Sequence, residues 1–313
     1  MARNALLAVD LGGTKLAAAL VDRAGKVTKA KSIGVDKSST LAPVEQILEL
    51  ARELAGTKSV REKLAAIAVA VPGLVRADGT VWAPNLPGWK RMALAQRLKA
   101  ALHVPVVVES DRNAVVLGEA WRGVARGKSD VIVLMLGTGI GAGILSGGRL
   151  LRGAHELSGC AGWMVVTDEY GPEAARVGQL ESLASGPGIA RTAKGELARE
   201  HGLREQIPAE AINACEVAEA ARRGDAASIK VYQEAGRLLG YAVANLVSLF
   251  DPEMLVIAGG LASASDLFLD SLKKSAKERA QPLIAKRVRV VVSRLGGNAN
   301  LLGVAHLAWG SLS

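Results

Sequence analysis

Residues 5–22, ALLAVDLGGTKLAAALVD, place two apolar runs on either side of the turn DLGGTK (10–15). Two such runs joined by a glycine pair predict two antiparallel strands, and VTKAKSIGV (27–35) is expected to add a third. Glycine lets a backbone approach a phosphate closely, and such a turn presents several N–H groups on one concave face. An Asp before the glycines and a Thr-Lys pair after them favour a phosphate-binding turn over a plain hairpin turn. The candidate nucleotide-contacting residues here are Asp10, Gly12, Gly13, Thr14 and Lys15.

The second half of the chain repeats this order of elements. Residues 131–151, VIVLMLGTGIGAGILSGGRLL, again alternate between apolar strands and glycine turns. Buried strands and helices follow each meander, among them LAAIAVAV (64–71) after the first and DPEMLVIAGG (251–260) after the second. Such a duplication predicts an α/β fold of two related lobes, each with a mixed sheet and flanking helices, and a cleft between them. We expect residues 1–117 with 299–313 to form a smaller N-terminal lobe and residues 118–298 a larger C-terminal lobe.

The glycine-rich stretch LGTGIGAG (136–143) has the letters of a dinucleotide-binding fingerprint. The segment after it, however, is another apolar strand rather than a helix. The fingerprint requires the helix because the pyrophosphate sits on the helix N-terminus, and a Walker loop fails for the same reason. Thr138 and Gly139 are therefore interpreted as a second phosphate clamp.

The segment ESDRNA (109–114) places Asp111 between the strand VPVVVESD (104–111) and a helix predicted over 113–121. The carboxyl end of a strand is a common ligand site in α/β sheets, but Asp is also a preferred helix N-cap, and both interpretations stay open. Phosphoryl transfer needs positioned phosphates, Mg²⁺ and a carboxylate that accepts the proton of the attacking hydroxyl. We predict Asp111 as this catalytic base and Asp10 as the residue that holds Mg²⁺ through water.

Composition limits the other classes of function. The 313 residues carry a net charge of +9, but Lys and Arg are scattered and aromatic residues make up only 3%, so a nucleic-acid-binding protein is not expected. Two distant cysteines, Cys160 and Cys215, give no disulfide framework and suit a reducing compartment. No signal peptide and no bilayer-spanning run is recognisable, so a cytoplasmic protein without a membrane partner is expected.

The four motifs DLGGTK, SDRNA, LGTGIGAGI and VIAGGLA, in this order over the whole chain, resemble those of the ROK family (repressors, open reading frames and sugar kinases). The resemblance implies the two-lobed, actin-like ATPase fold with ribonuclease H-like lobes, and a glucokinase-like, ATP-dependent carbohydrate kinase that uses Mg²⁺. It supports Asp111 as base, places Gly259 and Gly260 beside the adenosine, and puts Asn85 in APNLPGW (83–89) on the sugar-binding loop. It also implies a homo-oligomer, expected to be a dimer, assembled through the larger lobe.

The chain departs from the family where the family contacts the sugar. Cys160 stands at the family's sugar-binding Glu, Trp163 at its His, and Ser110 at the Asn before the catalytic Asp. Nearby His155 and Glu156 are either partial replacements or ordinary loop residues. The family's zinc segment is here GPEAARVGQLESLASGPGIA (171–190), without Cys or His, so no zinc is expected, and Glu181 matches the glutamate that ends that segment. The candidate substrate-binding residues are Gly73, Asn85, Ser110, Asp111, His155, Glu156, Cys160, Trp163 and Glu181.

These departures lead to a specific hypothesis. A thiol and an indole cannot replace a carboxylate and an imidazole as hydroxyl ligands, and a buried unpaired hydroxyl costs about 1–3 kcal/mol. We therefore predict phosphorylation of a sugar-like substrate other than plain glucose. The alternative is a catalytically degenerate sugar- or nucleotide-binding protein of the same fold. A DNA-binding repressor is not expected, because the first phosphate motif starts at Asp10 and leaves no helix-turn-helix before it.

Overall fold

The structure, a computed structural model, describes residues 4–56, 60–200 and 212–312 of the chain. Its contacts divide the chain into two compact units, each of which is described by itself. Unit 1 consists of Met1–Gly127, Leu150–Ser158 and Arg294–Ser313, and unit 2 of Lys128–Arg149 and Gly159–Ser293. The lobes predicted from the sequence, residues 1–117 with 299–313 and residues 118–298, stay a prediction.

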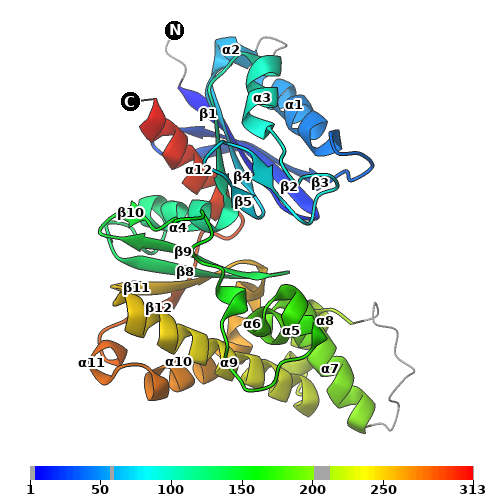
Figure 1. Ribbon diagram of the computed structural model, residues 1–313, viewed down its shortest axis with the longest axis vertical. Coiled ribbons are helices and arrows are strands. Elements are labelled where there is room, and N and C mark those ends of the chain that lie inside the picture. Colours follow the sequence, from blue (N-terminus) through cyan, green and yellow to red (C-terminus); the bar gives the residue numbers. More distant parts are fainter. Residues whose placement is uncertain (1–3, 57–59, 201–211, 313) are drawn as a thin grey trace. The chain divides into compact units, whose positions relative to one another are not determined.

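The sheet of unit 1 has the strand order β3-β2-β1-β4-β7 (Figure 1). β1 pairs antiparallel with β2 and β2 with β3, as the glycine-turn meander predicted, whereas β4 pairs parallel with both β1 and β7. The strands are β1 (Ala5–Leu11), β2 (Lys15–Asp22), β3 (Val27–Gly34), β4 (Leu64–Val71) and β7 (Val106–Ser110), and a separate ribbon joins β5 (Leu74–Val75) to β6 (Val81–Trp82).

Helices cover both faces of this sheet because side chains alternate along β1. Leu7 and Val9 belong to the core that includes α1 and α3, whereas Leu6 and Ala8 face the core built with α12. On the α12 face, β4 contributes only alanines, which bring the helix close to the sheet. The helices of unit 1 are α1 (Ala42–Ala55), α2 (Val60–Lys63), α3 (Leu94–Leu102), α4 (Asp111–Arg122) and α12 (Asn298–Ser311).

The helices α4 and α12 cross in backbone contact. A Cβ added at Gly303 would lie 1.7 Å from the carbonyl oxygen of Ala114, and one added at Gly118 would lie 2.1 Å from that of Ala299. Only glycine permits these approaches. The first turn of α12 is therefore held in one position over α4.

Unit 2 repeats the pairing of unit 1, with the strand order β10-β9-β8-β11-β12. β8 pairs antiparallel with β9, and β11 pairs parallel with β8 and β12, which confirms the predicted internal repeat. The strands are β8 (Val131–Leu136), β9 (Ile140–Ser146), β10 (Arg149–Leu150), β11 (Met254–Ala258) and β12 (Arg289–Val292). The helices are η1 (Ala161–Trp163), α5 (Pro172–Val177), α6 (Gln179–Ala184), α7 (Gly186–Glu200), α8 (Ala214–Arg222), α9 (Ala226–Phe250), η3 (Gly260–Ala264), α10 (Ser265–Arg279) and α11 (Pro282–Ala285).

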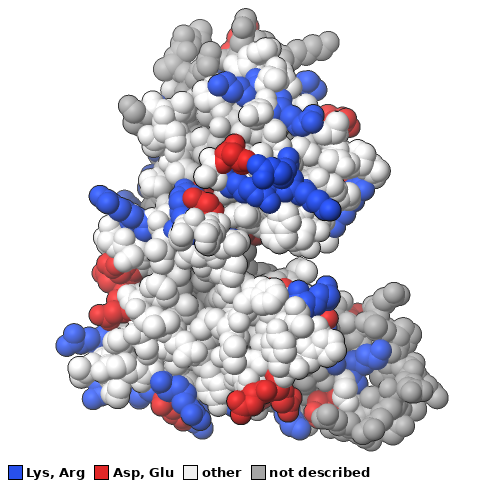
Figure 2. Space-filling model, viewed as in Figure 1, with Lys and Arg blue, Asp and Glu red and all other residues white. Residues whose placement is uncertain are grey.

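Charged side chains of both signs are interspersed on the face shown in Figure 2. On unit 1, for example, Asp78 pairs with Arg91, and Arg76 donates to the backbone of Lys90. None of the described helices is long and apolar enough to cross a bilayer.

Candidate active site

The first glycine turn joins β1 to β2 in unit 1. The Gly12 N–H donates to the carbonyl oxygen of Lys15 at 2.8 Å, which closes the turn. A Cβ added at Gly13 would lie 3.5 Å from the Cβ of Asn85, so the predicted phosphate turn and the predicted sugar loop are adjacent. Thr14 and Lys15 are exposed, with their hydroxyl and ammonium groups accessible to a ligand.

Asp10 lies at the end of β1, just before this turn. Burial raises the pKa of its carboxyl to about 6, although the amide of Asn300 donates to Oδ1 at 3.1 Å and the charge of Lys15 lies nearby. A largely desolvated carboxylate with one oxygen already bonded gains most from a cation beside the other. Asp10 therefore fits the water-mediated Mg²⁺ site predicted from the sequence.

Asp111 is the first residue of α4, directly after β7. The N-cap is Ser110, whose hydroxyl accepts from the Asn113 N–H at 3.4 Å, so the interpretation of Asp111 as N-cap was wrong. The helix begins two residues before the predicted start because Ser110 caps it. Asp111 is thus not the N-cap but lies in the first turn, where the helix dipole favours a carboxylate.

Two effects raise the pKa of Asp111 to about 7. Burial is the larger, and the negative charge of Asp10 adds to it, against the opposing charge of Arg112 and the hydrogen bond from the Arg112 N–H to Oδ1 at 2.8 Å. A general base is most effective when its pKa lies near the working pH. The environment of Asp111 meets this condition.

Glu109, which the sequence did not single out, anchors the strand end below Asp111. Only 2% exposed, it accepts from the Ser110 N–H at 2.8 Å and from the Asn113 amide at 2.9 Å. Arg152 bonds its other oxygen at 2.5 Å and lies 3.5 Å from Glu156. The signal in the sequence was a carboxylate inside an otherwise apolar strand, which needs a partner.

The other two candidate substrate residues of unit 1 differ in exposure. His155 is exposed, whereas Gly73 is half-buried. Gly73 has φ +105°, and a Cβ added there would lie 2.3 Å from the carbonyl oxygen of Trp82, so the position requires glycine. Its own carbonyl accepts from Arg112 at 3.4 Å. The structure therefore gives Gly73 a role in shaping the loop after β4.

The second glycine turn, in unit 2, is supported by Glu181. The Glu181 carboxylate accepts from the Ile140 N–H at 2.7 Å, and burial raises its pKa. Cβ atoms added at Gly139 and Gly162 would lie 2.8 and 2.9 Å from the same carboxylate oxygen. Two glycines thus make room for a carboxylate that fixes the turn carrying Thr138.

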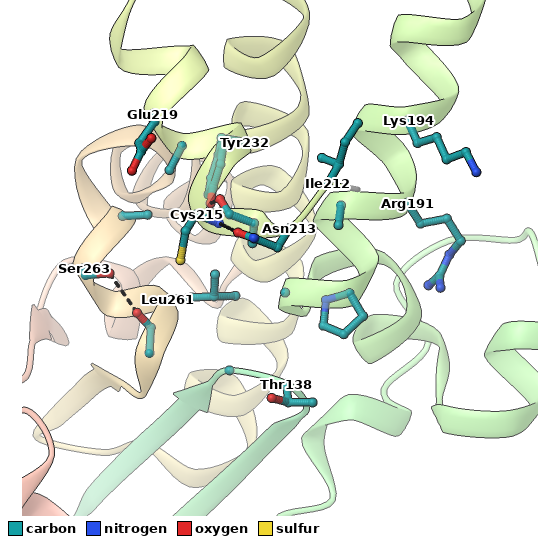
Figure 3. A pocket seen from close by; sticks show the side chains of 18 of the residues that line it. Thr138, Arg191, Lys194, Ile212, Asn213, Cys215, Glu219, Tyr232, Leu261 and Ser263 are labelled. Atoms are coloured by element: carbon teal, nitrogen blue, oxygen red, sulfur yellow. Dashed lines mark hydrogen bonds between the residues drawn. The ribbon is translucent and has the colours of Figure 1, made fainter. Parts of the chain in front are cut away.

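A cavity of about 1020 Å³ opens beside this turn (Figure 3). The Gly186 N–H donates to the carbonyl of Gly137 at 2.8 Å, and a Cβ added at Gly259 would lie 2.2 Å from the carbonyl of Leu136, so the two glycine motifs and α7 meet at its floor. Its volume is at the upper end of the usual range for small-molecule sites. The lining includes Thr138, Gly260, Leu261, Pro187, Arg191, Lys194, Ile212, Asn213, Cys215 and Glu219.

The two substituted sugar positions lie on the surface of unit 2. Cys160 is exposed and precedes η1, and Trp163, which ends η1, is 54% exposed. The indole face is therefore available to a ligand rather than part of the core. Among the described residues, no group of three or more His, Cys, Asp or Glu side chains is placed to hold a metal ion, and the expectation of no zinc stays a prediction.

Comparisons with known proteins agree with this geometry. A family model described as "ROK family" matches residues 6–310. A glucokinase of Halalkalibacterium halodurans is 31% identical over 94% of this chain and 92% of its own length, and one of Streptomyces coelicolor is 33% identical over 96% of both. The solved structure of a ROK family glucokinase from Streptomyces griseus, in complex with glucose and AMPPNP, superposes with a TM-score of 0.78 at 30% identity, covering 97% of this chain and 98% of that one. The two-lobed actin-like fold predicted from the motifs is confirmed by this similarity.

Proposed function

Because the chain belongs to the ROK family, we propose that it transfers a phosphoryl group from ATP to a hydroxyl of a sugar-like acceptor, with Asp111 as general base. The glucokinase relatives confirm the family and the enzyme class predicted from the sequence, an ATP-dependent carbohydrate kinase. The acceptor, the metal and the roles of individual residues are parts of the proposal.

The environment of Asp111 carries the proposal. Its carboxyl has a pKa raised to about 7 and feels the charge of a second half-buried carboxylate, Asp10, that is suited to a cation. When the acceptor hydroxyl attacks, Asp111 accepts its proton. Charge on Asp10 disfavours the charged form of Asp111, so a cation at Asp10 favours the deprotonated base.

Each unit has its own proposed nucleotide-binding residues. In unit 1 these are Asp10 and the backbone of the first glycine turn, with Thr14 and Lys15. In unit 2 these are the turn of Thr138 and Gly139 and the cavity beside Gly259 and Gly260. Bound Mg²⁺ neutralises phosphate charge, and ATP supplies the phosphoryl group. The apolar walls of the cavity suit the flat faces of a nucleobase.

The acceptor is proposed to differ from plain glucose. Trp163 presents an exposed indole suited to an apolar sugar face, while Cys160 and Ser110 offer weaker hydrogen bonding than a carboxylate and an amide. Ser110 is also occupied as the cap of α4. Glu181, already bonded to the Ile140 N–H, retains lone pairs for a substrate hydroxyl.

The degenerate binder remains the second candidate because of these substitutions. Asp111→Asn separates the two functions, since the amide keeps the shape of the carboxylate but cannot accept the proton. For a kinase we expect ATP-dependent phosphorylation to fall about 10²–10⁴-fold while calorimetric ADP affinity stays within about twofold. Equal acceptor-dependent turnover of both proteins would reject Asp111 as base.

The acceptor is identified by a thermal-shift screen of sugars, amino sugars and polyols in the presence of a nonhydrolysable ATP analogue. The expected result is stabilisation by a sugar-like compound beyond that from the nucleotide. Efficient phosphorylation of glucose, with a KM in the low millimolar range or below, would contradict the proposed specificity. No response beyond the nucleotide would favour the degenerate binder.

A further inference from the structure

Asn300 has one amide end bonded and the other unpaired. It is the third residue of α12, and its Nδ2 donates to Oδ1 of Asp10 at 3.1 Å. Its Oδ1 is buried and has no hydrogen-bond partner among the described residues. A buried acceptor without a partner is costly, and in native proteins such atoms often belong to a site for water or an ion.

Turning the amide over does not remove the unpaired atom. The Asn300 oxygen would then face the carboxylate oxygen of Asp10, which is also an acceptor, and a buried N–H₂ would lose its partner. The observed orientation is the one that satisfies Asp10. When Asp10 is charged, this orientation of the amide is therefore favoured, and it leaves the Asn300 Oδ1 unpaired.

The position of Asn300 is also rigid. Ala299 and Gly303, on either side of it in α12, are the residues in backbone contact with α4, the helix that begins at Asp111. The side chain of Asn300 is thus held beside Asp10 by a close-packed helix crossing rather than by a loop. Such preorganisation is what a precisely placed ligand site requires.

We propose that Asn300 is a positioning residue for the cation at Asp10: its Nδ2 orients the Asp10 carboxylate, and its Oδ1 accepts a hydrogen bond from a water in the hydration shell of Mg²⁺. Mg²⁺ keeps several of its waters when protein carboxylates bind it, so outer acceptors are part of such sites. The inference rests on the proposed function only through the metal role of Asp10. It assigns a residue outside all four motifs to the site.

The test measures metal binding directly. Mn²⁺, as a substitute for Mg²⁺, is titrated into the full-length protein with saturating ADP and followed by electron paramagnetic resonance. We expect Asn300→Ala to weaken Mn²⁺ binding about five- to tenfold, as for one hydrogen bond to an ion's water shell, while ADP affinity in EDTA changes less than about twofold. Asn298→Ala, the same change at an exposed residue of the same helix turn, should leave Mn²⁺ affinity unchanged.

Two further variants separate the role of Asn300 from that of Asp10. Asn300→Leu removes both polar atoms but keeps the side-chain volume, so it controls for a loss of stability in Asn300→Ala that comes from the smaller side chain. We expect both variants to weaken Mn²⁺ binding to a similar degree. Asp10→Ala should weaken Mn²⁺ binding more than either. Unchanged Mn²⁺ affinity in both Asn300 variants, with loss in Asp10→Ala, overturns the role of Asn300 alone. Unchanged affinity in Asp10→Ala refutes the metal role in the proposed function itself.

Discussion

At the scale of single residues, two carboxyl groups of unit 1, those of Asp10 and Asp111, have raised pKa values. Both carboxyls are desolvated, and the charge of Asp10 raises the pKa of Asp111 further. Since the folded-state pKa of Asp111 is raised from 3.8 to about 7, its contribution to stability is fully present below pH 3.8 and is lost as the pH rises through about 7. The site therefore gives up some stability at neutral pH to hold a charged base.

The pH dependence of catalysis follows from the same shift. Asp111 must be deprotonated to accept a proton, so kcat/KM should fall about tenfold per pH unit below the pKa of Asp111, which is about 7 without a cation at Asp10 and lower with one. The measurement is kcat/KM from pH 5.5 to 8.5 at saturating Mg²⁺, with Asp111→Asn as control, whose residual activity should lack this limb. An acidic limb that is equally steep in Asp111→Asn and in the unchanged protein would argue against Asp111 as base.

Acceptor choice is also decided by single residues. Restoring the family's groups in Cys160→Glu/Trp163→His should raise kcat/KM for glucose by about tenfold or more, because a carboxylate and an imidazole can bond hydroxyls that a thiol and an indole leave unpaired. Coupled-assay kinetics with glucose measure this gain, and activity toward the protein's own acceptor should fall. If the double variant gains nothing on glucose, specificity lies elsewhere in the site.

At the scale of elements, the crossing of α4 and α12 positions the two helices that begin at the site. Gly303→Ala places a Cβ 1.7 Å from a backbone oxygen, so the helices must separate. The expected loss is about 1–3 kcal/mol, of the order found for overpacking.

The control for this prediction lies in the same helix. Gly310 is exposed, and a Cβ there meets nothing within 4 Å, so Gly310→Ala should be neutral or stabilising by up to about 1 kcal/mol through helix propensity. Urea unfolding of both variants gives the comparison. Equal stabilities would mean that α12 adapts to α4 and does not hold Asn300 rigidly.

At the scale of the whole molecule, unit 2 carries exposed apolar side chains consistent with the proposed dimer. Val165, 71% exposed, shares a surface hollow with Tyr241 and Asn245 of α9, and Leu249, 77% exposed, follows one turn later in the same helix. Large apolar side chains exposed to this degree are candidates for a protein interface. The dimer proposed from the family resemblance would bury this surface.

Light scattering tests the oligomeric state. We expect a mass of twice the 32.4 kDa of one chain, and Val165→Glu/Leu249→Glu should shift it toward the monomer by placing charges in the interface. Leu41→Glu, at an exposed leucine of unit 1, should leave the dimer intact. A monomeric wild-type protein would refute the proposed dimer.

Sequence alone determined the fold class, the internal repeat and the motifs, because local signals carry them. Strand alternation, glycine pairs and strand-to-helix junctions are readable over a few residues, as in 10–15 and 136–143, and the order of these motifs identifies the family. The strand predicted over 64–71 has the same bounds in the structure, where it is β4, for the same reason.

Only the tertiary structure decided which distant residues act on these motifs. Asn300 bonds Asp10 from 290 positions away, Arg152 reaches Glu109 across 43, and Glu181 supports the turn at Ile140 across 41. It also decided that Ser110, and not Asp111, caps α4, because the Ser110 hydroxyl accepts the capping hydrogen bond from the Asn113 N–H. Such contacts and pKa shifts arise from packing and burial, which no short stretch of sequence encodes.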